Sequence, residues 1–238
     1  MYGITDMHCH ILPGLDDGAK TMEETMAVLV EAERQHIVRM IATPHFHPGR
    51  HSASGRQVLR TLNRVRRCAD NLGISVELLP GQECFYYTGL VEELDKGNAL
   101  TLAGSRYVLV EFDPDCIYSY LTRGLQELQD NGYMPILAHY ERYYCLSGQD
   151  SLRRLKDKGI LLQLNFDTLT RRRGPFHKNQ WKADAREGLI DYFGSDCHGT
   201  EFRPLHITEA CAWINRNLSG EQQERILNRN IQNIINMN

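Results

Sequence analysis

The chain has 238 residues, of which 42% are hydrophobic and 24% are charged, so it has the composition of a globular protein with a sizeable core. Its net charge of −3 and sequence pI near 6.4 give no general case for binding nucleic acid or an anionic membrane. No apolar stretch approaches the roughly 20 residues that span a bilayer, and no basic segment precedes an apolar run at the N-terminus. We therefore expect a cytoplasmic protein without direct membrane insertion.

Strand-like and helix-like segments alternate along the whole chain. The first strand precedes His8, and the first helix begins at Thr21, which would form a capping box with Glu24. Further strands are predicted at residues 39–43, 75–79, 107–112, 134–138, 161–166 and 191–195. Helices are predicted at residues 58–72, 90–94, 120–128, 151–158 and 181–187, followed by a helical tail over 207–235. This alternation of about seven strands with helices or long loops predicts a parallel sheet within a single domain, residues 1–238.

Metal-capable side chains stand at the ends of these predicted strands. Parallel strands that close into a barrel bring their C-terminal ends to one rim, so ligands spread over about 190 residues would converge on one pocket. Purely structural roles would require acids or histidines to end about six of roughly seven strands by accident. Together with an aspartate from the first long loop, the candidates are His8, His10, Asp17, His45, Glu83, Glu111, His139, Asp196 and His198.

The chemistry of this set points to several divalent cations. Mixed imidazole and carboxylate ligands suit Mn²⁺, Fe or Zn²⁺ better than Ca²⁺. The set is too large for one tetrahedral ion, so we expect two or three cations in a cluster. Its carboxylates would also repel one another unless bound cations offset their charge.

Two arginines on the same predicted rim indicate the substrate. Arg142 follows His139, and Arg203 follows His198 after a short loop. Because a guanidinium fork matches phosphate bidentately, they predict a phosphoryl substrate, attacked in line by a water that the cations activate. Residues 46–51 could also contact the substrate.

Two other segments of this rim give weaker indications of a role in catalysis or substrate binding. His47 is a weak candidate for a general acid. The run Arg171–Arg173 could attract an acidic peptide, although a solvated loop is the simpler interpretation.

The cysteines suggest a reduced protein. The chain has seven cysteines and no Cys-x-x-Cys pair, which predicts neither a disulfide framework nor a zinc ribbon. Cys9 and Cys197 alternate with candidate ligands, so we expect both thiols to face away from the cations and to be inert. The spacing from Cys197 to Arg203 matches that of thiol-based tyrosine phosphatases. We interpret it as coincidence, because Glu201 would put a carboxylate where the phosphate binds.

Seven short motifs, in order and over nearly the whole chain, resemble the metal-dependent protein-tyrosine phosphatases of capsular and exopolysaccharide loci. These enzymes belong to the PHP (polymerase and histidinol phosphatase) superfamily. The motifs are Asp6-Met7-His8-Cys9-His10, Leu15-Asp16-Asp17-Gly18, Thr43-Pro44-His45, Gly81-Gln82-Glu83, Arg106-Tyr107-Val108-Leu109-Val110-Glu111-Phe112, His139-Tyr140-Glu141-Arg142-Tyr143 and Asp196-Cys197-His198. The fifth and sixth motifs together are specific to this branch.

The resemblance implies an α/β fold, a distorted TIM-like (β/α)7 barrel known as the PHP fold, with a trinuclear site usually described with Mn²⁺, Fe or Mg²⁺. It implies that the substrate is the phosphotyrosine-rich tail of a bacterial tyrosine kinase that controls polysaccharide assembly. The family's metal ligands correspond to the nine candidates above, and its phosphate-binding arginines correspond to Arg142 and Arg203. One departure is the pair Glu201-Phe202 before Arg203, since the adjacent acid could weaken its hold on phosphate.

Other functions stay open at this point. A histidinol-phosphate or other small phosphomonoester phosphatase of the same superfamily would use the same site. Amidohydrolases and nucleases fit less well, because no predicted strand end offers a bridging lysine and the chain is acidic overall. A non-catalytic metal-binding or kinase-docking module is the alternative of another class, and the complete ligand set argues against it.

Overall fold

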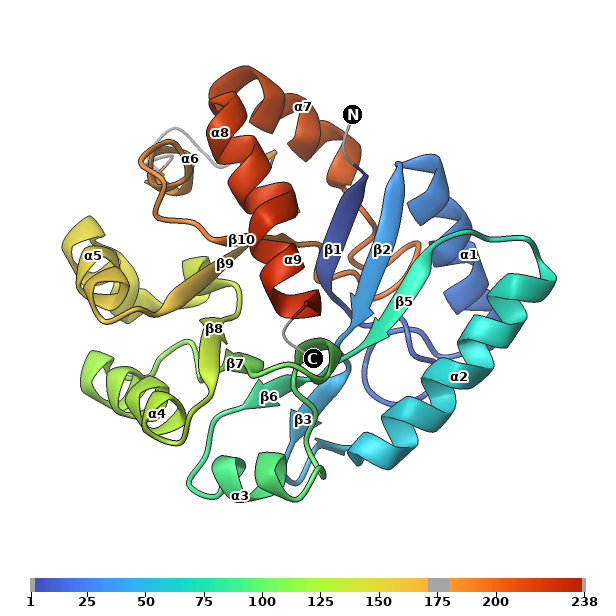
Figure 1. The fold of residues 1–238 in the computed structure, drawn as a ribbon, viewed down its shortest axis with the longest axis horizontal. Coiled ribbons are helices and arrows are strands. Elements are labelled where there is room, and N and C mark those ends of the chain that lie inside the picture. The colour runs from blue at the N-terminus through green and yellow to red at the C-terminus, as the bar shows by residue number, and fades with distance from the viewer. Residues whose placement is uncertain (1–2, 171–179, 237–238) are drawn as a thin grey trace.

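In the computed structural model, which describes residues 3–170 and 180–236, short parallel strands surround an apolar interior and helices lie outside them (Figure 1). The strands are β1 (Ile4–Cys9), β2 (Ile37–Ala42), β3 (His45–His47), β4 (His51–Ser52), β5 (Glu77–Pro80), β6 (Glu83–Phe85), β7 (Tyr107–Glu111), β8 (Met134–Leu137), β9 (Leu161–Asn165) and β10 (Tyr192–Gly194). The α-helices are α1 (Met22–Arg34), α2 (Gly55–Asn71), α3 (Leu90–Asp95), α4 (Tyr118–Asp130), α5 (Gln149–Asp157), α6 (Gln180–Arg186), α7 (Ile207–Asn217), α8 (Gly220–Glu224) and α9 (Asn230–Ile235). None of the helices in the described ranges is long and apolar enough to cross a bilayer.

The first and last strands of the barrel lie side by side, which closes the barrel. The strand order is β1-β2-β5 in one sheet and β10-β9-β8-β7-β6-β3-β4 in the other, and every pairing except β3 with β4 is parallel. Cys9 and Cys197 form a parallel bridge that joins the two sheets. On either side of it, the His10 N–H donates to Cys197 O and the Asp196 N–H donates to His8 O, both at 2.8 Å.

The barrel is distorted because two of its strand units are broken. After β2, the segment Thr43-Pro44 interrupts the ladder before β3 continues it, and Gly81-Gln82 does the same between β5 and β6. Pro44 contributes to the interruption because it has no N–H to donate. When β2 with β3 and β5 with β6 are each counted as one unit, seven parallel units close the barrel, which confirms the predicted fold class.

Local capping explains two differences at helix starts. Thr21 caps α1 and accepts from the Glu24 N–H at 3.2 Å, but the Glu24 carboxylate accepts from the Lys20 N–H instead, so the predicted capping box is only half formed. Helix α2 begins at Gly55, before the predicted residue 58, because the Gln57 side chain accepts from the Ser54 N–H at 2.8 Å.

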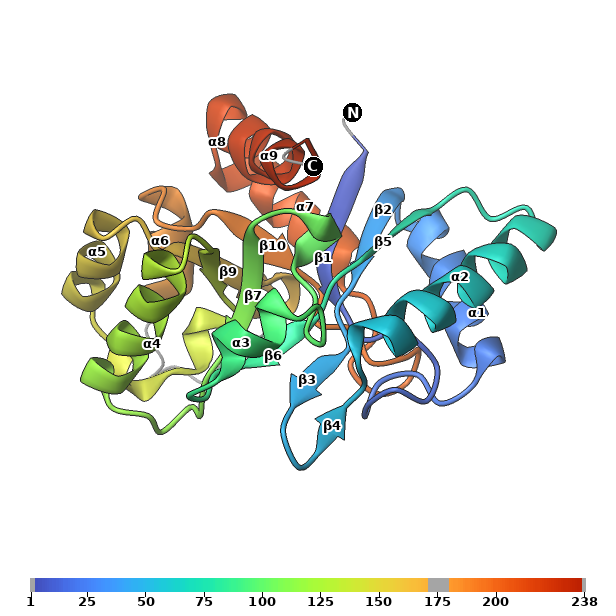
Figure 2. The same ribbon diagram turned by 60° about the horizontal axis from the view of Figure 1, so that its bottom comes forward.

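One end of the barrel is closed by the C-terminal helix, which leaves the other end for the site. Ile231 and Ile234 of α9 pack against the apolar interior of the barrel, and the Tyr192 hydroxyl donates to Asn230 O at 3.2 Å. Figure 2 shows α9 near the N-terminus, at the end where the strands start, and the β3–β4 hairpin at the opposite end. The C-terminal ends of the strands therefore form the accessible rim.

Candidate metal centre

The structure brings all nine predicted ligands together at the C-terminal ends of the strands. Their positions follow from the breaks and ends of the strands: β1 carries His8, the segments after β1 carry His10 and Asp17, β3 and β6 begin with His45 and Glu83, β7 ends with Glu111, and His139, Asp196 and His198 follow β8 and β10. The sequence placed His45 and Glu83 after strands at 39–43 and 75–79. In the structure they begin strands of their own, because the interrupted ladders resume there.

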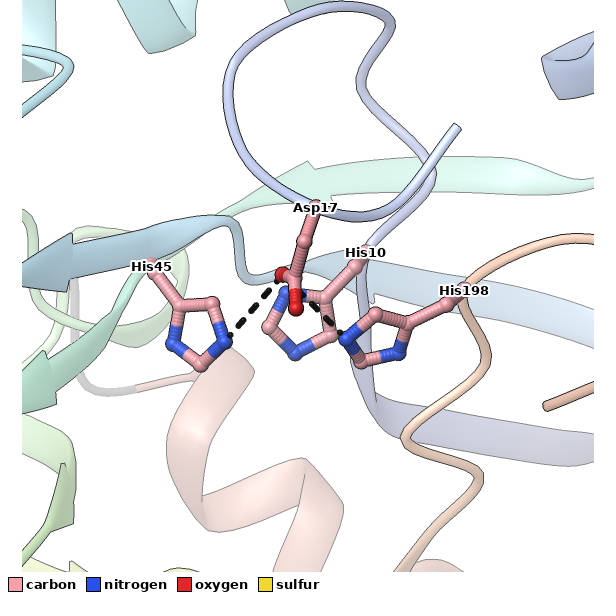
Figure 3. Close-up of side chains that lie close together, drawn as sticks. All are labelled: His10, Asp17, His45 and His198. Atoms are coloured by element: carbon pink, nitrogen blue, oxygen red, sulfur yellow. Dashed lines mark ion pairs between the residues drawn. The ribbon is translucent and has the colours of Figure 1, made fainter. Parts of the chain in front are cut away.

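Eight of these side chains form three overlapping groups, in each of which the donor atoms lie within 4.8 Å of one another, and the ninth, His139, contacts Glu83. The groups are His10, Asp17, His45 and His198; His8, His10 and Asp196; and His45, Glu83 and Glu111. Figure 3 shows the first group, in which the Asp17 carboxylate lies between two imidazoles, 3.5 Å from Nε2 of His45 and 3.4 Å from Nε2 of His198. His10 and His45 each belong to two groups, so the three groups form one continuous cluster.

Glu83 lies at the centre of the cluster and is fully buried. Its Oε2 lies 3.2 Å from Nε2 of His8, 3.2 Å from Nε2 of His10 and 3.1 Å from Nδ1 of His45, while Oε1 lies 2.6 Å from Nε2 of His139. Burial raises the pKa of this carboxyl, but the surrounding imidazoles outweigh burial and hold the pKa well below its usual range. Glu83 is therefore an anion whose oxygens face nitrogen atoms on several sides.

The orientation of two histidine rings tests whether this cluster suits cations. The Nδ1 atoms of His8 and His10 lie 3.1 Å from the Gln163 Oε1 and 2.8 Å from the Asp16 Oδ2. Both partners are acceptors, so we assign the proton of each neutral ring to Nδ1, which leaves a lone pair on each Nε2. The two Nε2 atoms are only 3.1 Å apart, and two lone pairs at that distance repel unless a positive charge lies between them.

In the protein alone, protons can supply that positive charge. Burial lowers the pKa of His10, but the carboxylates of Asp16, Asp196 and Glu83 raise it further than burial lowers it. Among the described residues, Oε2 of Glu83 and Nδ1 of His45 are buried and make no hydrogen bond. Unsatisfied buried acceptors and converging lone pairs fit divalent cations with mixed nitrogen and oxygen ligands.

Three of the five non-glycine residues with positive φ in the described structure lie at this rim. His139, Asp196 and Arg203 have φ values of 32°, 52° and 46°, in the left-handed region that residues other than glycine seldom adopt. Strained conformations of this kind often occur at functional sites, where the surrounding structure holds them in place.

An open cleft of about 310 Å³ lies against the cluster, and both predicted arginines line it. Nη2 of Arg142 forms an ion pair with Oδ2 of Asp196, and Nη1 of Arg203 lies 3.5 Å from the same oxygen. Among the described residues, Arg203 forms no ion pair with neighbouring Glu201, and its guanidinium lies 5.4 Å from the ring centroid of Phe202. The two guanidinium groups thus meet at the border between the cleft and the cluster.

The β3–β4 hairpin also lines the cleft. His47, Arg50 and His51, from the β3–β4 hairpin, line it together with Phe85 and Pro114. Their role in binding substrate stays a prediction. The run Arg171–Arg173 lies outside the described residues.

A family model described as capsular polysaccharide synthesis, CpsB/CapC, matches residues 4–236. The chain belongs to the CpsB/CapC family.

Named relatives cover nearly the whole of this CpsB/CapC chain. It is 32% identical over 221 residues to tyrosine-protein phosphatase YwqE of Bacillus subtilis, covering 91% of this chain and 85% of YwqE. It is 28% identical over 236 residues to tyrosine-protein phosphatase CpsB of Streptococcus pneumoniae, with 97% of both chains covered.

Solved structures agree with the fold. A structure from work on YwqE and CpsB, described there as metal-dependent tyrosine phosphatases, matches with a TM-score of 0.87 and 29% identity over 98% of this chain and 94% of that one. The phosphotriesterase homology protein of Escherichia coli matches with a TM-score of 0.61 at 11% identity, over 97% of this chain and 98% of that one. This second likeness shows the barrel fold alone.

Sequence reasoning missed the residues that orient the ligands of the CpsB/CapC site. Asp16 is buried, and its Oδ2 accepts from both the His10 ring and the His45 N–H, the latter at 2.9 Å. Oε1 of Gln163 accepts from the His139 N–H at 2.8 Å as well as from His8. The available signals were a second carboxylate beside Asp17 and a glutamine between two leucines of β9.

The two cysteines between ligands are buried, as expected from the alternation of side chains. The Cys9 Sγ donates to Ile41 O and the Cys197 Sγ donates to Gly199 O, each at 3.3 Å. Burial raises the pKa of Cys197 to about 12, so its thiol is protonated at neutral pH. This argues against a thiolate nucleophile at Cys197.

Proposed function

We propose that this CpsB/CapC protein is a metal-dependent protein-tyrosine phosphatase. The observation that carries the proposal is the meeting of Arg142 and Arg203 at Asp196, which shares a group of donor atoms with His8 and His10. A phosphate held by both guanidinium groups would therefore lie directly against the cluster. The tyrosine-phosphatase names of the relatives support the same activity.

We propose two or three divalent cations, held by the nine clustered ligands, with Mn²⁺ as the leading candidate and Fe, Mg²⁺ or Zn²⁺ as alternatives. Glu83 and Glu111 have two oxygens each and can bridge neighbouring cations, which imidazoles cannot do. Bound cations would neutralise charge on the phosphoryl group and lower the pKa of water toward about 7.

The two arginines then have a defined task. Each guanidinium is paired with the buried Asp196 carboxylate, whose pKa is held well below its usual range by His10 and Arg142 in spite of burial. A phosphate dianion entering the cleft offers more acceptor oxygens than this single carboxylate. We infer that Arg142 and Arg203 bind the phosphoryl oxygens and stabilise the additional charge of the transition state.

The cleft suits an aryl phosphate. Phe85 and Phe112 contribute to its lining, and the His47 ring lies with its centroid 4.1 Å from that of Phe85. The His47 Nδ1 donates to Pro48 O at 2.9 Å, so Nε2 can give a proton to a leaving oxygen only when both ring nitrogens are protonated. A phenolate leaves without strong acid assistance, so a weak donor at this position is sufficient for phosphotyrosine.

We propose a tyrosine-phosphorylated bacterial kinase that controls capsular or exopolysaccharide synthesis as the partner. The family description, capsular polysaccharide synthesis, supports this assignment. All seven cysteines are free thiols, which favours a reducing compartment, and we propose a cytoplasmic location. We also propose that residues 1–238 form one domain, since the barrel uses strands from both ends of the chain.

Metal analysis of the purified protein, combined with steady-state hydrolysis, tests the activity. We expect bound divalent metal and much higher kcat/KM for a phosphotyrosine peptide than for a phosphoserine peptide or histidinol phosphate. Preference for histidinol phosphate would replace the proposal with the small-molecule alternative. Absence of turnover in metal-loaded protein would contradict the proposal and favour the alternative of a non-catalytic metal-binding or kinase-docking module.

A further inference from the structure

Helix α2 carries a row of exposed arginines that the proposed active site does not use. Arg56, Arg60, Arg64 and Arg67 are all exposed, and their spacings of four, four and three residues place them on one face of the helix. The opposite face, which includes Val58, Leu62 and Val65, is buried in the layer between helix and barrel. We call the four arginines the α2 arginine row.

The row forms no ion pair within the described part of the chain, whereas Arg66 of the same helix donates to Leu78 O. Like charges three or four residues apart on a helix repel by a few tenths of a kcal/mol per pair. The chain as a whole has a net charge of −3, so this row is a local concentration of positive charge. A bound anion would reduce the repulsion among the four arginines.

The position of the row connects it to the cleft. Arg50 and His51, which line the cleft, belong to the hairpin whose second strand, β4, ends at Ser52, and α2 begins three residues later at Gly55. Figure 2 shows α2 running outward from this hairpin along the side of the barrel. The row spans twelve residues of helix, so its ends are about 16 Å apart, a distance that an extended peptide covers with about five residues.

We propose that the α2 arginine row is a docking surface for an acidic peptide segment that flanks the phosphotyrosine in the cleft. The shared chemistry is a run of anionic groups on an extended chain, supplied by glutamate and aspartate side chains or by further phosphorylated tyrosines. This inference rests on the proposed phosphatase function and adds a substrate preference to it. The row acts on substrate binding and leaves the chemical step unchanged.

The test uses metal-loaded protein and two phosphotyrosine peptides that differ only in about six flanking residues on each side, all Glu in one and all Gln in the other. A third peptide carries additional phosphotyrosines in the Gln background, to separate the two sources of charge. We expect wild-type kcat/KM to favour the anionic peptides by about 3- to 10-fold at low salt, with the preference falling as salt rises. Hydrolysis of p-nitrophenyl phosphate gives the basal activity.

The variant Arg60→Glu with Arg64→Glu should lose this preference and keep basal activity. The matched control is Arg154→Glu with Lys158→Glu, which makes the same change in charge at exposed positions four residues apart on and beside α5. The control should keep the preference. The neutral variant Arg60→Gln with Arg64→Gln should give an intermediate ratio, and its circular dichroism should match that of the wild type.

The outcomes separate the two proposals. If wild-type protein hydrolyses none of the substrates, the phosphatase function fails. If it hydrolyses them and the charge reversal on α2 leaves the peptide preference unchanged, the docking surface is refuted while the phosphatase function stands. Unchanged peptide preference combined with lost binding to phosphatidylserine vesicles would assign the row to a membrane surface and also overturn the proposal.

Discussion

Asp16 fixes the ring of His10, because its Oδ2 accepts a 2.8 Å hydrogen bond from Nδ1 and turns Nε2 toward the centre of the cluster. The same carboxylate accepts from the N–H of Gly18 and the N–H of His45, each at 2.9 Å. One buried side chain thus positions two candidate ligands and the loop that carries a third, Asp17. Carboxylates behind metal-bound imidazoles generally raise ligand basicity and hold the ring orientation.

Replacing Asp16 with Asn should weaken metal binding by roughly 10- to 100-fold. An amide presents an oxygen on one side only, so it cannot accept from His10 and His45 on one side and from Gly18 on the other. Calorimetric titration of Mn²⁺ into metal-free protein measures the change. Asp115→Asn is the control, because Asp115 is exposed on the same rim and contacts none of the candidate ligands in the described structure. Equal affinities of the two variants would show that Asp16 does not orient ligands.

Replacing Arg142 with Ala should lower kcat for p-nitrophenyl phosphate by roughly 10²-fold or more, since a preorganised donor to the transition state is lost. Arg142→Lys keeps the charge without the planar fork and should recover only part of the activity. Metal content must be measured in both variants, because Arg142 also pairs with the candidate ligand Asp196. Near wild-type turnover in the metal-loaded Ala variant would remove Arg142 from the mechanism.

Chelation and alkylation should have opposite effects on activity. EDTA should abolish hydrolysis, and added Mn²⁺ should restore it, since the cations supply the charge neutralisation that the chain lacks. Iodoacetamide should leave activity intact, because Cys197 is buried and burial raises its pKa to about 12. Inactivation by iodoacetamide together with resistance to EDTA would support a thiol mechanism instead.

The sequence predicts the barrel and its rim well, because both depend on patterns local to each strand. Short apolar runs with an acid or histidine at the end identify β7 and β8 directly, and the barrel geometry then brings Glu111 and His139 together. Strands of two or three residues, such as β3, β4 and β6, are too short to show a periodicity, so the broken strand units were not predicted.

The residues that orient the ligands were not predicted, because their roles depend on contacts between segments that are distant in the sequence or on the fold of a loop. The bond between His8 and Gln163 joins residues 155 positions apart, and only the closed barrel makes them neighbours. Asp16 is an acidic residue in a loop and would ordinarily be exposed, yet the turn folds it beneath His10. Which of two adjacent aspartates faces the cluster is decided by that turn rather than by residue type.

Gly18 holds this turn in place, and Gly18→Ala should disturb both stability and metal binding. A Cβ at this position would lie 2.1 Å from the backbone oxygen of His10 and 2.5 Å from its Cβ, so the backbone itself would have to move. Overpacking of this kind typically costs roughly 1–3 kcal/mol, measurable as a lower midpoint in urea unfolding of the metal-free protein. Mn²⁺ affinity should fall as well, because the displaced loop carries Asp16 and Asp17. Gly148→Ala, where an added Cβ meets no atom within 4 Å in the described structure, is the matched control. If the two alanine variants have the same urea midpoint and the same Mn²⁺ affinity, close packing at Gly18 is not what positions the loop.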